Sequence, residues 1–290
     1  LSKEFFILIN NWFMIFFLVV VLIGTLYPIA LEVLSGQKIS VGPPYYNIVL
    51  APFLIPFLFF LSYGPQTKWL SSQQENKKKN LVIFSISIII VLSFFFLSDT
   101  KSILINLILV SSIYLIIQTI LDFILSFKKS FKIFIDNDLS RIISHLGFGL
   151  LILFISLNSI FSVEYDFNLK VGEIKNENRY EISLKNLNVS SEKNYKKITG
   201  DVIVSNNQKN ISEFLKPEIR IYDKPETITY EASIKSRVFS DIYVTMSNLS
   251  ESDFYNIKLQ NKPFMNLIWI SVIIISLGGF LRIIVGRKKI

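Results

Sequence analysis

Six apolar stretches, each long enough to cross a lipid bilayer, constrain the fold of this chain more than any other feature. A helix needs about twenty apolar residues to span the hydrocarbon core, and 51% of the residues here are hydrophobic. Inside a membrane only helices and closed barrels satisfy every backbone polar group. The sequence therefore predicts an integral membrane α-helical bundle with six transmembrane helices, over residues 12–31, 47–63, 81–98, 103–127, 142–161 and 264–285.

Positive charges concentrate at alternate ends of these six stretches. Cytoplasmic loops of membrane proteins collect Lys and Arg. In the short loops on one side the basic residues are Lys38 and Lys101, whereas the other side carries Lys3, Lys68, Lys77, Lys78, Lys79, Lys128, Lys129, Lys132, Arg141, Arg282, Arg287, Lys288 and Lys289. We therefore expect both termini in the cytoplasm.

The same asymmetry explains the net charge of +8. Residues 163–263 hold fifteen basic and fifteen acidic side chains, so the whole excess belongs to the membrane part. A basic nucleic-acid-binding face is therefore not expected.

A polar segment, residues 163–263, separates the fifth and sixth stretches and is predicted to lie outside the cytoplasm. Apolar residues alternate with polar ones around positions 180–184, 202–204, 219–221, 228–234, 242–246 and 255–259, which is typical of strands. Turn-forming runs at Ser205-Asn206-Asn207 and Asp223-Lys224-Pro225 separate some of them. We expect three parts: a membrane domain over 1–162, an all-β sandwich or barrel over 163–263, and a last helix with a basic tail over 264–290.

Motifs for common chemistries are absent from the sequence. It has no Gly-rich phosphate loop, no cysteine and one histidine, so it offers neither a zinc cluster nor a histidine triad in the polar segment. The absence of cysteine also excludes a thiol carrier.

The single histidine, His145, lies near the start of the fifth apolar stretch. Ionisable side chains in membrane helices usually face a bundle interior, a cofactor or a water-filled path. A neutral imidazole can ligate haem iron inside an apolar helical bundle. It can equally form a hydrogen bond to a neighbouring helix. From position alone these two roles are equally supported.

The loop after the first stretch, residues 35–47, is the second unusual feature. Its glycines and its Pro43-Pro44 pair restrict the backbone. Lys38, Gly42, Pro43, Pro44 and Tyr45 form a candidate outer-loop motif that could hold an anionic or aromatic group. The alternative interpretation is a simple turn.

Several motifs together resemble a known family from one end of the chain to the other. They are residues 24–28 (GTLYP), 36–47 (GQKISVGPPYYN), 145–148 (HLGF), 162–164 (SVE), 240–244 (SDIYV), 262–264 (KPF), Trp269 and Gly278-Gly279. In this order they resemble the C-terminal half of the CcmF family of cytochrome c maturation proteins. The paralogous NrfE type, an assembly factor for nitrite reductase, shares this region.

The resemblance implies a haem lyase acting outside the cytoplasm. Substrate haem, delivered by the chaperone CcmE, is joined through thioether bonds to apocytochrome c, which a CcmH-type subunit binds. The family also holds a b-type haem in the membrane between two histidines, and His145 matches the second of these iron ligands. The first ligand and the outer residues that bind substrate haem lie N-terminal to the matched region. We therefore expect no catalytic residue in this chain.

The missing half is expected to come from the N-terminal part of the same protein or from a separate N-terminal subunit. The first residue, Leu1, likewise predicts a truncated or naturally split chain. The expected location is the bacterial inner membrane with the β-domain in the periplasm, or the mitochondrial inner membrane for an organellar chain. The alternative function is a membrane scaffold whose β-domain docks partners and whose His145 is structural.

Topology predicts that the haem b lies on the cytoplasmic side of the membrane. His145 follows Arg141 by four residues, so it lies about 6 Å from the predicted helix end. Arg141 is one turn away on the same face. Arg141 either pairs with a haem propionate or serves as a positive-inside anchor. Nearby Asp122 either pairs with a basic side chain or reaches the lipid headgroups.

Overall fold

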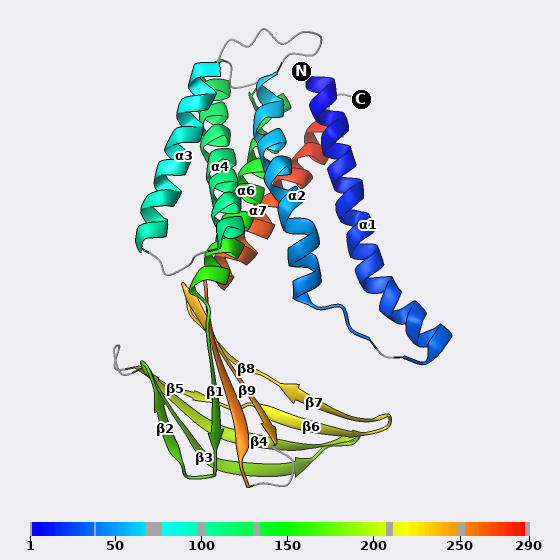
Figure 1. Ribbon diagram of the computed structural model, residues 1–290, viewed down its shortest axis with the longest axis vertical. Coiled ribbons are helices and arrows are strands. Elements are labelled where there is room, and N and C mark those ends of the chain that lie inside the picture. The colour runs from blue at the N-terminus through cyan, green and yellow to red at the C-terminus, as the bar shows by residue number, and fades with distance from the viewer. Residues whose placement is uncertain are drawn as a thin grey trace. The chain divides into compact units, whose positions relative to one another are not determined.

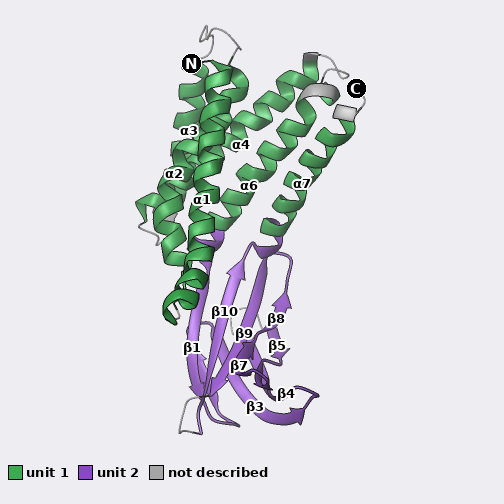
Figure 2. Cartoon of the chain, turned by 90° about the vertical axis from the view of Figure 1, so that its right-hand side faces the viewer, with its two compact units in different colours: residues 1–156, 268–290 green, residues 157–267 purple. Residues whose placement is uncertain are grey.

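The computed structural model describes residues 2–37, 39–67, 77–97, 102–129, 134–206, 211–248 and 253–287. The chain divides into two compact units, residues 1–156 with 268–290 and residues 157–267 (Figure 2). Some residues used in the sequence analysis lie outside the described ranges: Lys38, Lys68, Lys101, Lys132, Asn207, Lys288 and Lys289.

The first unit is a bundle of long helices, as predicted (Figure 1). Within the described residues, six helices are long and apolar enough to cross a membrane. They are α1 (Lys3–Ser35), α2 (Pro43–Tyr63), α3 (Lys77–Leu97), α4 (Ile103–Lys129), α6 (Leu139–Phe161) and α7 (Met265–Arg287). The 3₁₀ turn η1 (Gly64–Gln66) follows α2, and the π-helical turn η2 (Phe134–Asp138) precedes α6.

Helix α1 begins nine residues before the predicted span. The Ser2 side chain accepts a hydrogen bond from the Phe5 backbone N–H and caps the helix. At 33 residues, α1 is about 50 Å long, which exceeds the hydrocarbon thickness of about 30 Å. Its first two residues, Lys3 and Glu4, therefore need not lie in hydrocarbon.

The Gly and Pro residues of the outer loop end one helix and begin the next. Gly36 closes α1 in the left-handed conformation, with φ of 70°, and donates its N–H to Glu32 O. Gly42 precedes α2, and Pro43 occupies the first helical position, where a missing N–H is harmless. A Cβ on Gly24 would lie 2.5 Å from Tyr46 Oη, so α1 and α2 approach closely here.

Small residues also allow α6 to pack closely on its neighbours. Cβ atoms built on Gly147 and Gly149 would lie 2.9 Å from Ile275 of α7 and 2.8 Å from Ile116 of α4. Across the α6–α7 contact, Ser140 Oγ donates a 2.8 Å hydrogen bond to Gly278 O. Small residues and interhelical hydrogen bonds are the usual means of helix association in membranes.

The second unit contains a β-sandwich, as predicted for the polar segment. One sheet has the order β1-β10-β9-β8, and the other has the order β2-β3-β4-β6-β7 with β5 also paired to β4. The strands are β1 (Val163–Leu169), β2 (Ile174–Glu177), β3 (Tyr180–Ser191), β4 (Tyr195–Asn206), β5 (Ile211–Leu215), β6 (Glu218–Asp223), β7 (Glu226–Glu231), β8 (Ser233–Ser236), β9 (Ser240–Asn248) and β10 (Tyr255–Pro263).

Alternate residues of both sheets form the sandwich core. Ile182 of β3, Val204 of β4, Val244 of β9 and Leu259 of β10 are all buried. Paired positions share a face: Ile182 lies opposite Val204, and Leu259 opposite Val244. Tight pairing of the predicted alternating segments therefore produces one hydrophobic core.

An ion cluster links the two sheets at one edge. Glu213 of β5 contacts the Arg237 guanidinium at 2.8 Å and Lys235 Nζ of β8 at 3.3 Å. The hydrogen bond from Arg237 is the main cause of a lowered pKa for the Glu213 carboxyl group. The ionised carboxylate therefore favours the folded sandwich.

Gly278→Ala should destabilise the helix bundle, whereas Gly279→Ala should not. A Cβ on Gly278 would lie 2.8 Å from the Ser144 backbone N, but the adjacent Gly279 faces open space. Overpacking of this kind costs about 1–3 kcal/mol. Unfolding of both variants in detergent, followed as a function of denaturant, measures the difference; equal stability of the two would contradict the close α6–α7 contact.

Glu213→Gln should lower the stability of the sandwich by up to about 1 kcal/mol at pH 7. Because the folded-state pKa of Glu213 is lowered, its contribution is complete above the unfolded value of about 4.3 and disappears as the pH falls through the folded value. At pH 7 the urea midpoint of the variant should therefore be lower than that of the parent. At pH 3 the two midpoints should be equal. Glu226→Gln, at an exposed position on β7, is the control; a deficit of Glu213→Gln that persists at pH 3 would refute the electrostatic explanation.

Candidate functional site

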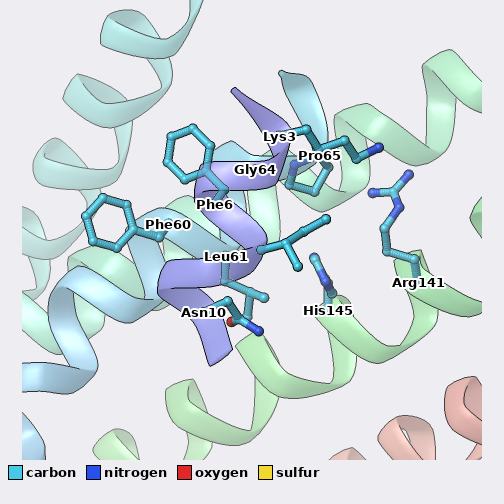
Figure 3. A pocket seen from close by; sticks show the side chains of 10 residues that line it. Lys3, Phe6, Asn10, Phe60, Leu61, Gly64, Pro65, Arg141 and His145 are labelled. Atoms are coloured by element: carbon cyan, nitrogen blue, oxygen red, sulfur yellow. The ribbon is translucent and has the colours of Figure 1, made fainter. Parts of the chain in front are cut away.

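The His145 side chain lines an apolar cavity of about 230 Å³ (Figure 3). Residues from α1, α2, η1 and α6 form its walls, so segments far apart in the sequence meet here. The lining residues are Lys3, Phe6, Ile7, Asn10, Phe60, Leu61, Gly64, Pro65, Arg141 and His145. Tertiary packing thus places the predicted histidine between this apolar cavity and a much smaller polar one that Gln118 and Asp122 also line.

His145 lies six residues after the first residue of α6, about 9 Å along the helix axis. Within the part of the chain that the structure describes, neither ring nitrogen forms a hydrogen bond. The suggested hydrogen bond to a neighbouring helix is therefore not formed by these residues. The imidazole is left able to ligate a metal or to bind a polar group.

Asn10 is a polar residue of this cavity that the sequence analysis did not identify. Its side-chain Oδ1 is buried and has no hydrogen-bond partner among the described residues. A buried acceptor without a protein partner usually binds an ordered water or a ligand, or has a functional role. The only sign of Asn10 in the sequence is a polar amide beside an apolar stretch. Its proximity to His145 depends on how α1 packs against α6.

Arg141 lies beside His145 and is held by two carboxylates. Its Nη1 contacts Asp122 Oδ2 of α4 at 2.5 Å, and its Nη2 contacts Asp138 Oδ1 of η2 at 2.9 Å. The three side chains are 26–31% exposed. Asp122 thus pairs with a base, one of the two roles considered for it. A propionate at Arg141 would have to share the guanidinium with both aspartates.

Further polar groups of α4 lie behind this ion cluster. Gln118 Nε2 donates to Asn80 Oδ1 and to Tyr114 Oη, both at 3.0 Å. Gln118 and Asp122 also line a polar cavity of about 240 Å³ with Gln66 and Lys79. The apolar cavity of His145 therefore adjoins a polar region within the same bundle.

The outer-loop motif lies away from His145. Gly42, Pro43, Pro44 and Tyr45 are at the first turn of α2, whereas the cavity is lined by Phe60 and Leu61 at its other end. Phe60 follows Tyr45 by fifteen positions in the helix, which corresponds to about 22 Å. The outer-loop motif and His145 therefore belong to two separate sites. Lys38 lies outside the described residues.

The donor set fits one side of a haem. Across the described residues, no group of three His, Cys, Asp or Glu side chains could hold a metal ion. One imidazole in an apolar pocket suits an axial position on a flat hydrophobic macrocycle. The cavity volume is below the range of about 300–1,000 Å³ typical of complete ligand sites. His145 and its neighbours are thus suited to forming part of a larger site.

Comparison with known proteins gives matches over the β-sandwich and over the whole chain. A family model described as the CcmF C-terminal beta-sandwich matches residues 160–263. The chain is 25% identical to the cytochrome c-type biogenesis protein CcmF of Pseudomonas aeruginosa, covering 100% of this chain and 45% of the relative. It is 28% identical to the CcmF of Haemophilus influenzae, covering 97% and 44%. The chain thus spans less than half the length of these relatives.

A solved structure has the same fold. It is named Cytochrome c Heme Lyase CcmF and aligns with a TM-score of 0.73 at 17% identity, covering 97% of this chain and 46% of that chain. The common fold includes the long helices and the β-sandwich inserted between the fifth and the last of them.

Asp122→Asn and Arg141→Gln should be energetically coupled. A hydrogen bond to a charged group contributes about 1.5–3 kcal/mol, and each single variant leaves a partner unmatched. A double-mutant cycle on unfolding in detergent should therefore give a coupling of about 1–2 kcal/mol. The control cycle combines Asp122→Asn with Arg282→Gln at an exposed position of α7, where the effects should add. Additivity in the first cycle would show that the pair is energetically unimportant.

Proposed function

We propose that this chain is the C-terminal part of a haem lyase of the CcmF family, because its β-sandwich matches the CcmF C-terminal model and the chain aligns with about 45% of the length of CcmF relatives. In this proposal His145 is one axial ligand of a b-type haem in the membrane. The second ligand comes from the N-terminal part of the protein or from a separate N-terminal subunit.

The observation that supports this role most directly is the setting of His145. Its imidazole lines an apolar cavity and lacks a hydrogen-bond partner among the described residues. A structural histidine in a membrane bundle would be expected to use its polar atoms in an interhelical hydrogen bond. An axial ligand instead needs a free ring nitrogen and walls that exclude water.

The neighbouring side chains have positioning roles in this proposal. Phe6, Phe60 and Leu61 keep the ligand nitrogen in an apolar environment. Asp122 and Asp138 hold Arg141 one turn from His145 and neutralise its charge. When bound, a b-type haem supplies one-electron transfer. Arg141 remains a candidate partner for a propionate, and Asn10 Oδ1 offers an acceptor to a polar group or water in the same cavity.

The positive charges support an orientation with this site near the cytoplasmic face and the β-sandwich in the periplasm of a bacterial inner membrane. Attachment of substrate haem to apocytochrome c would then occur on the opposite side, with thiols supplied by the apocytochrome because this chain has no cysteine. We propose CcmE and a CcmH-type subunit as further partners. The catalytic residues would lie in the N-terminal part.

His145→Ala should abolish the b-type haem signal of the chain assembled with its N-terminal part. The variant removes an axial ligand while leaving the apolar walls in place, and added imidazole should restore part of the reduced-haem absorbance. Asn10→Ala is the matched control, because it alters the same cavity without removing an iron ligand. An unchanged spectrum in His145→Ala would exclude the ligand assignment.

A further inference from the structure

The loop between β8 and β9 exposes two adjacent apolar side chains at the end of the sandwich where the membrane helices attach. Val238 is 70% exposed and Phe239 is 67% exposed. Leaving adjacent large apolar residues in water is unfavourable. The position of this loop relative to the helix ends indicates what covers them.

Hydrogen bonds fix the loop at the start of α7. The Phe264 backbone N–H donates to Phe239 O at 2.8 Å, and Asn266 Nδ2 donates to Arg237 O at 2.7 Å. Phe264 immediately precedes the first residue of α7, and Asn266 is the second residue of that helix. The loop therefore lies level with the beginning of the sixth span.

The end of α6 lies at the same level. Asn158 Nδ2 of its last turn donates to Pro263 O at 2.5 Å, and the Phe161 ring lies 6.3 Å from the Phe264 ring. All of these residues belong to the second compact unit, residues 157–267. Two helices that are long and apolar enough to cross a membrane thus begin or end beside the loop.

The backbone of the loop is held independently of its apolar side chains. The Arg237 backbone N–H donates to Ser240 O at 3.2 Å, and the Arg237 guanidinium is bound by Glu213. A fixed loop presents Val238 and Phe239 without the entropy loss of ordering a mobile segment.

We infer that Val238 and Phe239 insert into the boundary between lipid headgroups and acyl chains of the membrane that the helices span. The partner is the lipid surface itself, because the loop lies beside the ends of two transmembrane helices. Aromatic side chains commonly occupy this depth. The insertion anchors the sandwich by a third point in addition to its two covalent connections.

Environment-sensitive labels can test the insertion, because the natural sequence contains no cysteine. Val238→Cys in the full chain, labelled with a nitrobenzoxadiazole probe, is reconstituted in phosphatidylethanolamine and phosphatidylglycerol vesicles. We expect blue-shifted emission that is quenched by lipids carrying a nitroxide near the headgroup and not by aqueous iodide.

Val171→Cys is the matched control. Val171 is 48% exposed in the turn after β1, and the extended strand places it roughly 25 Å from the end of α6. Its label should be quenched by iodide and not by the nitroxide lipids, which also shows that the sandwich faces the outside of the vesicles. Iodide quenching at position 238 equal to that at 171 would overturn the inference. Protection of position 238 from both quenchers would also overturn it, because a protein surface would then cover the loop.

Discussion

The close packing of α6 against its neighbours is the constraint on which the membrane part depends. Gly147 admits α7 and Gly149 admits α4 at distances that a larger side chain would prevent. Because helical residues three or four apart share a face, Arg141, His145 and Gly149 lie along one side of α6, whereas Gly147 lies on the opposite side. The glycines thus allow α7 and α4 to approach α6, while His145 still lines the cavity formed with residues of α1 and α2.

Electrostatics complements this packing. A guanidinium in a membrane bundle is unfavourable without partners, and α4 and η2 each supply a carboxylate to Arg141. The resulting cluster lies between the polar region around Gln118 and the apolar cavity of His145. This arrangement keeps a paired charged group within one helical turn of the imidazole.

The sandwich is a separate unit with its own core, yet its first and last strands continue directly from α6 and into α7. These strands, β1 and β10, are hydrogen-bonded neighbours, so the two helix ends must emerge close together. Such an insertion needs no long linker. The relatives are about twice as long as this chain, which is consistent with a cavity at His145 that is smaller than a complete ligand site.

The six membrane helices and the all-β character of the inserted segment could be predicted from the sequence, because bilayer thickness sets the length of an apolar span and strand pleating sets an alternation of period two. It also identified His145 and Arg141. Tertiary structure decided what surrounds them: Asn10 and Phe60 meet His145 across large sequence separations, and no local pattern specifies such helix contacts. It likewise decided which strand residues are covered, since Ile234 alternates correctly but lies 52% exposed on the edge strand β8. Burial depends on which surfaces face one another, and that is settled only when the whole chain packs.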